Sequence, residues 1–100
     1  MDIKSAVKSE INKIEPKNEV ILFGSRARGD FKPDSDWDFL ILLETPAIQK
    51  QQKEAILTAL YQLELASNHV INPLIYTKQD WAARSVTPIF RIIQKEGLAA

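Results

Sequence analysis

Residues 21–43 read "ILFGSRARGDFKPDSDWDFLILL" and place a polar turn and several aspartates between two apolar runs. The first apolar run, residues 19–23, is short and continuous and is ended by Gly24 and Ser25, which predicts a buried strand. Residues 25–29 then suit a tight turn or the first turn of a helix. The order of a strand, a glycine turn and a second apolar run indicates adjacent elements of one sheet.

The second strand is expected at residues 36–43, where side chains alternate between two faces. One face is apolar throughout and consists of Trp37, Phe39, Ile41 and Leu43. The other face begins with carboxylates and becomes apolar farther along, with Asp36, Asp38, Leu40 and Leu42. Because both faces are apolar farther in, we expect a central strand that carries its carboxylates only at its beginning.

The flanking segments alternate between helical and extended patterns. They predict a helix over 3–14, a long helix over 47–67, a strand over 69–76, a short helix that begins at Trp81 after the capping-box pattern of 77–80, and a last helix over 88–96. Pro73 lacks a backbone donor and places the third strand at a sheet edge or a bulge. These elements predict an α/β or α+β fold, with a small mixed sheet and helices on one side.

The composition indicates one ordinary globular domain over residues 1–100, with 45% hydrophobic and 26% charged residues. Lysine plus arginine equals aspartate plus glutamate at 13 each, so no long-range positive field exists to collect an extended nucleic acid. The chain has no cysteine, no apolar run of membrane-spanning length and no signal-peptide pattern at its start. We therefore expect a cytoplasmic protein that binds neither a membrane nor an extended nucleic acid.

Asp36 and Asp38 share one face of the second strand, roughly 6–7 Å apart along the chain. A divalent cation beside them would offset their repulsion, and Mg²⁺ commonly binds one or two carboxylates together with substrate phosphates. Upstream, Gly24 lets the backbone come close to a ligand, and the amides of residues 25–28 can hold phosphate oxygens. The sequence therefore predicts a phosphate-binding turn and metal-binding carboxylates on neighbouring elements.

Residues 24–42, "GSRARGDFKPDSDWDFLIL", resemble the G-S-x-A-R-G…S-D-x-D-[LF] signature of the minimal nucleotidyltransferases of the polymerase-β superfamily. The resemblance implies that Gly24 and Ser25 hold the β and γ phosphates of a nucleoside triphosphate. It also implies that Arg26 or Arg28 adds positive charge there. The two arginines lie two residues apart, so at most one is expected to face the phosphates, and which one stays open.

The same resemblance implies that Asp36 and Asp38 are the catalytic metal ligands and hold two Mg²⁺ ions. The reaction would transfer a nucleoside monophosphate from a nucleoside triphosphate, expected to be ATP, to a hydroxyl acceptor. A chain of this length has no separate acceptor domain. The acceptor is therefore expected on a protein partner, or in a site shaped by a second subunit of a homodimer.

One position departs from the family's pattern. Members of the family usually supply a third carboxylate from the next core strand, and the nearest equivalent here is Asn72. An amide can offer its carbonyl oxygen to a metal, but it brings no charge and cannot take a proton. Glu64, near the end of the long predicted helix, substitutes only if the fold brings it round to the aspartates.

Two functions follow from this pattern. The chain is either a Mg²⁺-dependent nucleotidyltransferase or a catalytically degenerate nucleotide-binding module, because similar members of the family serve as antitoxins beside a small helical toxin. The remaining conspicuous side chains have simpler explanations. His69 is expected to be structural or on the surface. Trp37, Phe39, Trp81 and Phe90 are expected to lie in the core or at an edge that faces the nucleotide base.

Overall fold

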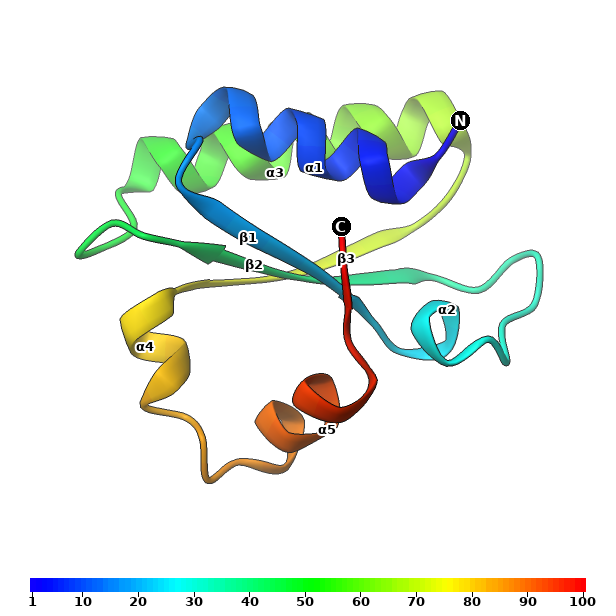
Figure 1. Cartoon of the computed structure of the whole chain (residues 1–100). Coiled ribbons are helices and arrows are strands. Elements are labelled where there is room, and N and C mark those ends of the chain that lie inside the picture. Colours follow the sequence, from blue (N-terminus) through cyan, green and yellow to red (C-terminus); the bar gives the residue numbers. More distant parts are fainter.

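A mixed sheet of four strands forms the centre of the computed structural model, which describes residues 1–100 (Figure 1). The strands are β1 (Asn18–Phe23), β2 (Trp37–Leu43), β3 (Ile71–Thr77) and β4 (Leu98–Ala99), in the order β3-β2-β1-β4. β2 pairs antiparallel with β1 and parallel with β3, and β4 pairs antiparallel with β1. β2 is thus central, as its two apolar faces predict, and Pro73 lies in an edge strand.

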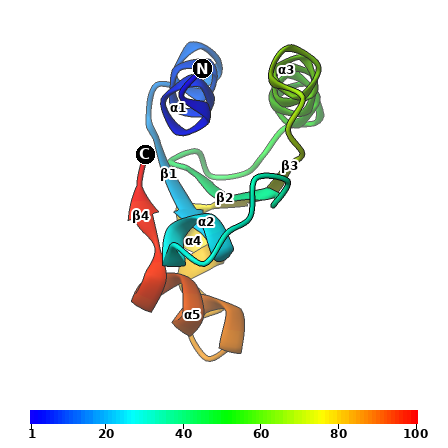
Figure 2. The ribbon, with the colours of Figure 1, turned by 90° about the vertical axis from the view of Figure 1, so that its right-hand side faces the viewer.

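Helices cover both faces of this sheet (Figure 2). They are α1 (Ile3–Ile14), α2 (Ser25–Arg28), α3 (Lys50–Ser67), α4 (Lys78–Ala82) and α5 (Pro88–Glu96). α1 and α3 bury one face of β2 through a core that includes Val7, Ile11, Phe39, Ile41, Leu43, Ile56 and Leu60. α4 and α5 bury the other face through a smaller core of Leu40, Leu42, Trp81 and Ile93.

The mixed α+β fold predicted from the sequence is confirmed. The expectation that all helices lie on one side of the sheet is wrong, because α1 and α3 cover one face and α4 and α5 cover the other. The difference originates in β2, because Leu40 and Leu42 point away from α1 and α3 and are 0% and 5% exposed. Fully burying one such side chain stabilises a fold by about 1.5–3 kcal/mol. A second helical layer on that face is therefore favoured.

Thr77 ends β3 and caps α4. Its buried hydroxyl accepts a hydrogen bond from the Asp80 amide at 3.0 Å, as the capping-box pattern predicts. The prediction that Trp81 begins this helix is wrong, because the cap makes Lys78 the first helical residue. Trp81 lies near the end of α4, where it is buried against the sheet.

Several other bounds differ from the prediction, including that of β2, which begins at Trp37 and leaves Asp36 just outside the strand. α3 begins at Lys50, because the Thr45 hydroxyl donates to the Ala47 carbonyl at 2.8 Å and holds the preceding residues in a turn. β3 begins at Ile71, after a left-handed turn at Asn68. The two-residue strand β4 has no pattern of its own and forms on the free edge of β1. None of the helices has the length and apolar character that crossing a membrane would require.

The Thr77 cap gives a first testable prediction. Thr77→Ala removes the acceptor for the Asp80 amide at a buried position, and we expect it to lower the free energy of unfolding by about 1 kcal/mol in urea titration. Thr58→Ala is the matched control, because Thr58 is exposed on α3 and alanine favours a helix interior. Equal destabilisation by both substitutions would contradict the capping role.

Candidate functional site

Asp36 lies just before β2 and Asp38 is the second residue of that strand, and Asn72 of β3 contacts both. The parallel register of the two strands places Asn72 opposite Asp38. The Asn72 Nδ2 donates hydrogen bonds to the Asp36 Oδ2 at 3.0 Å and to the Asp38 Oδ1 at 3.2 Å. A single neutral amide thus bridges both carboxylates. Pro73, the next residue, lacks a backbone donor, but the strand keeps its register there and the Asn72 side chain faces the aspartates.

Gly24 lies directly against this carboxylate pair. Its φ angle is +79°, in the region that favours glycine, and a Cβ added to it would overlap the Asp38 Oδ2. The antiparallel register accounts for this contact, because Phe23 pairs with Asp38 and Gly24 is the next residue. The turn expected to hold phosphates and the carboxylates expected to hold a metal are therefore in contact.

The turn continues into α2. The Gly24 carbonyl accepts hydrogen bonds from the amides of Ala27 and Arg28, both at 3.0 Å, which closes the first helical turn. Ser25 and Arg26 open the helix, so their amides have no carbonyl one turn earlier to bond with. Together with the Ser25 hydroxyl, these amides are the donors that the turn offers to an anion.

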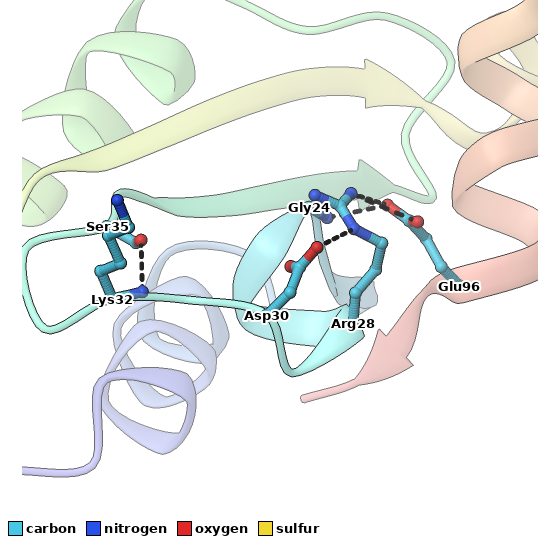
Figure 3. A network of polar contacts seen from close by, with 6 residues as sticks. All are labelled: Gly24, Arg28, Asp30, Lys32, Ser35 and Glu96. Atoms are coloured by element: carbon cyan, nitrogen blue, oxygen red, sulfur yellow. Dashed lines mark hydrogen bonds and ion pairs between the residues drawn. The ribbon is translucent and has the colours of Figure 1, made fainter.

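Glu96, at the end of α5, contacts the same turn through its carboxylate (Figure 3). Its Oε1 accepts a hydrogen bond from the Gly24 amide at 3.0 Å and another from the Arg28 Nη1 at 3.2 Å. The Arg28 Nε donates in turn to the Asp30 Oδ2 at 3.3 Å. The hydrogen bond to Asp30 is the main cause that raises the pKa of Arg28 above its usual value, and Glu96 adds to it.

Arg26 points into the loop between α2 and β2. Its guanidinium donates to the Ser35 carbonyl at 3.0 Å and to the Pro33 carbonyl at 3.1 Å. It also stacks between the rings of Phe31 and Trp37, at 4.4 and 4.5 Å from their centroids. Both candidate arginines thus have protein partners, and phosphate binding by either one stays a prediction.

Glu64 does not join the aspartates. Its Oε2 accepts a hydrogen bond from the Ile71 amide at 2.9 Å, at the beginning of β3. His69 packs edge-on against Trp37 at 6.0 Å, in keeping with a structural position. Phe39 and Trp81 are buried, and Trp37 and Phe90 are half-buried, so the aromatic residues pack as expected for core positions.

The donor set at the start of β2 fits a magnesium ion that shares its coordination with a substrate. Asp36 and Asp38 offer carboxylate oxygens on one face, and rotation of the Asn72 amide would present a carbonyl oxygen in place of the nitrogen. No group of three aspartate, glutamate, histidine or cysteine side chains is arranged to hold a metal. Phosphate oxygens and water would therefore complete the coordination of a bound ion.

Glu96 is the site residue that sequence reasoning missed. The Thr87 cap, Pro88 and Gly97 predict the bounds of α5, and the structure confirms them. They carry no information on what the end of α5 contacts. Glu96 lies 72 residues from Gly24 along the chain, and no spacing rule connects the two.

Comparisons with known proteins bear on the same elements. Residues 3–87 match a family model described as a nucleotidyltransferase domain. A protein of Methanocaldococcus jannaschii, named as a candidate protein adenylyltransferase, is 38% identical over 78 residues, which are 77% of this chain and 71% of that protein. A crystal structure described as a toxin–antitoxin with AMP-PNP matches 97% of this chain and 71% of its own, with a TM-score of 0.67 and 16% identity. At that identity the likeness supports the fold alone.

The Arg26 contacts generate the second prediction. Arg26→Ala removes the hydrogen bonds and the ring contacts that hold the loop before Asp36, and we expect a loss of about 1–3 kcal/mol in unfolding free energy. Arg26→Lys keeps the charge without the planar fork and should lose an intermediate amount. Arg91→Ala serves as the control, because Arg91 is exposed and makes no ion pair. Urea titration measures all three, and an Arg26→Ala loss no larger than that of the control would exclude this bracing role.

Proposed function

The chain belongs to the nucleotidyltransferase domain family, and from this membership we propose that it is a Mg²⁺-dependent enzyme that transfers AMP from ATP to a hydroxyl group on a protein. Residues 1–100 act as one nucleotidyltransferase domain in this proposal. The contact between Gly24 and Asp38 is the observation that supports it best. In-line transfer needs the phosphates and the metal-binding carboxylates to lie close together. This contact places the turn at Gly24 directly against Asp38.

Each element has a role in the proposed reaction. Ser25 and the free amides of the turn hold the β and γ phosphates, with Gly24 allowing their close approach, and Arg28 is the nearer source of positive charge. Asp36 and Asp38 hold Mg²⁺, with two ions expected from the family pattern. Bound Mg²⁺ supplies charge neutralisation at the phosphates and activation of the acceptor hydroxyl.

The bonds that change are those at the α phosphorus. The acceptor oxygen forms a new bond to it, the bond to the oxygen that bridges to the β phosphate breaks, and pyrophosphate leaves. In this proposal the hydroxyl proton passes to solvent, because Asn72 cannot take it, Glu64 is engaged at Ile71, and Asp36 and Asp38 hold the metal. This chain's residues therefore contribute mainly positioning and charge.

The acceptor is proposed to lie on another protein chain. Five hollows on the surface are lined by residues other than Asp36, Asp38 and Asn72, so none of these five is an acceptor pocket at the carboxylates. The M. jannaschii relative is named for protein adenylylation, and the structural neighbour is described as a toxin–antitoxin with AMP-PNP. A protein partner, or a second copy of this chain, fits these observations.

Nucleotide binding gives the third prediction. Mg·ATP at about 100 times its Kd should stabilise the wild-type protein by about 2.7 kcal/mol, measured as a rise in Tm. Asp36→Asn should abolish the Mg²⁺-dependent part of that rise. Asp34→Asn is the control from the same loop, because Asp34 is exposed and bonds to no other side chain, and it should respond as the wild type does. An equal Tm rise in the presence of EDTA would refute the proposed site.

A second function is favoured by Asn72. Its amide takes the place at which the family usually carries a third carboxylate, and it donates to one oxygen of each aspartate. A chain with an amide at this position could bind nucleotide without transferring it. The chain would then serve as a nucleotide-binding interaction module beside a protein partner, in the manner of an antitoxin.

The substitution Asn72→Asp separates the two functions and is the fourth prediction. In an enzyme the new carboxylate supplies a metal ligand and a base, and transfer of labelled AMP to protein should rise by about 10²–10⁴-fold. In a binding module no transfer appears. Stability without Mg²⁺ should fall in either case, because a third charge replaces the bridging amide beside Asp36 and Asp38. Wild-type activity equal to that of the variant would show that another group completes the site.

A further inference from the structure

Glu96 places a carboxylate on two donors of the turn that is proposed to hold the triphosphate. The Gly24 amide and the Arg28 guanidinium both donate to its Oε1, at 3.0 and 3.2 Å, and a longer contact joins Arg28 to its Oε2 at 3.4 Å (Figure 3). The Glu96 side chain is only 16% exposed, whereas the Arg28 side chain is 46% exposed. The carboxylate is therefore held against the turn by the fold of α5.

This contact crowds negative charge around the turn. Asp38 touches Gly24 on one side, Glu96 bonds to it on another, and Asp30 shares Arg28 with Glu96. One guanidinium thus serves two carboxylates in a region that also holds Asp36. A triphosphate tail brings several more negative charges to the same place, and its terminal phosphate cannot share the Gly24 amide with a carboxylate.

We infer that Glu96 is an internal stand-in for a phosphate group, which occupies the Gly24 amide and Arg28 in the free protein and is displaced when a triphosphate binds. The inference rests on the proposed function, because it concerns the nucleotide of the same site. Glu96 acts on affinity and on the position of α5 and takes no part in the chemical step. A monophosphate lacks the tail that would displace it, so Glu96 affects binding of the triphosphate and not of AMP.

Displacement of Glu96 has a structural consequence at the end of the chain. Gly97 follows Glu96 directly, and the two-residue strand β4 joins the sheet through the pairing of Leu98 with Leu22 and of Ala99 with Ile21, followed by a hydrogen bond from the Ala100 amide to the Val20 carbonyl at 2.9 Å. α5 itself has one buried residue, Ile93, and one partly buried residue that packs beside it, Phe90. Release of the Glu96 contact should therefore loosen α5 and β4 while the remainder of the sheet stays paired.

The affinity test compares Glu96→Gln with the wild type. Glutamine can still accept a hydrogen bond from the Gly24 amide but carries no charge, so the fold should be kept. Isothermal titration with Mg²⁺ and β,γ-imido-ATP should show a Kd lower by about fivefold to tenfold, while the Kd for AMP stays the same. Glu54→Gln is the matched control, because Glu54 is an exposed glutamate on α3 whose partner is Lys50, and it should change neither Kd.

The outcomes distinguish this inference from the proposed function. If the wild type binds β,γ-imido-ATP and Glu96→Gln binds it no more tightly, the stand-in role is wrong and the proposed function stands. If Glu96→Gln weakens binding, Glu96 is a support for Arg28 and the inference is likewise overturned. If neither protein binds the nucleotide with Mg²⁺, both the proposed function and the inference fail.

A measurement on the unaltered protein provides an independent check. Hydrogen exchange of the amides in residues 93–99 should become faster when β,γ-imido-ATP and Mg²⁺ are added, and should not change with AMP and Mg²⁺. Exchange in α1 and α3, on the opposite face of the sheet, is the internal reference. Slower exchange in residues 93–99 with the triphosphate would show that α5 closes on the nucleotide instead, and would overturn the inference.

Discussion

The pairing of β2 with a strand on each side is the constraint on which the rest of the structure depends. The same register that buries Leu40 and Leu42 on one face and Phe39 and Ile41 on the other also aligns Asp38 with Phe23 and Asn72. A shift of the register by one residue would exchange the two faces of β2 and would turn Asp38 toward α1 and α3. The cost of burying a carboxylate in that apolar core therefore protects the geometry of the candidate site.

The charged groups around the site are satisfied within the protein by specific partners. Asn72 bridges the aspartates, Arg26 holds the loop that leads to Asp36, and Arg28 lies between Asp30 and Glu96. Only Ser25 and the amides at the start of α2 are left as donors in the turn. These contacts supply hydrogen-bond partners but leave more carboxylates than guanidinium groups around the turn, and a bound nucleotide would have to replace some of them.

Family membership and local chemistry answer different questions about this chain. The match over residues 3–87 and the 38% identical relative establish a nucleotidyltransferase domain. They leave the acceptor and the metal to be decided by the residues of the site, and there Asn72 is the decisive departure. A neutral amide donates to both Asp36 and Asp38 but offers no base, and this is the residue at which the two proposed functions differ.

The sequence by itself determined the features that depend on local periodicity and backbone chemistry. The two apolar faces and central position of β2, the turn at Gly24 and Ser25, the cap at Thr77 and the bounds of α5 all follow from residues within a few positions of each other. The D-x-D spacing is also a local pattern, and it was enough to place Asp36 and Asp38 where the strand begins.

Only the tertiary structure decided which of these elements meet. Asn72 lies 36 residues from Asp36 and 34 from Asp38 along the chain, and Glu96 lies 72 residues from Gly24. The second helical layer, the β4 strand and the inward direction of Arg26 likewise depend on surfaces that form when distant segments pack. Such contacts are selected by the burial and charge of the whole fold, and these are properties that no local pattern contains.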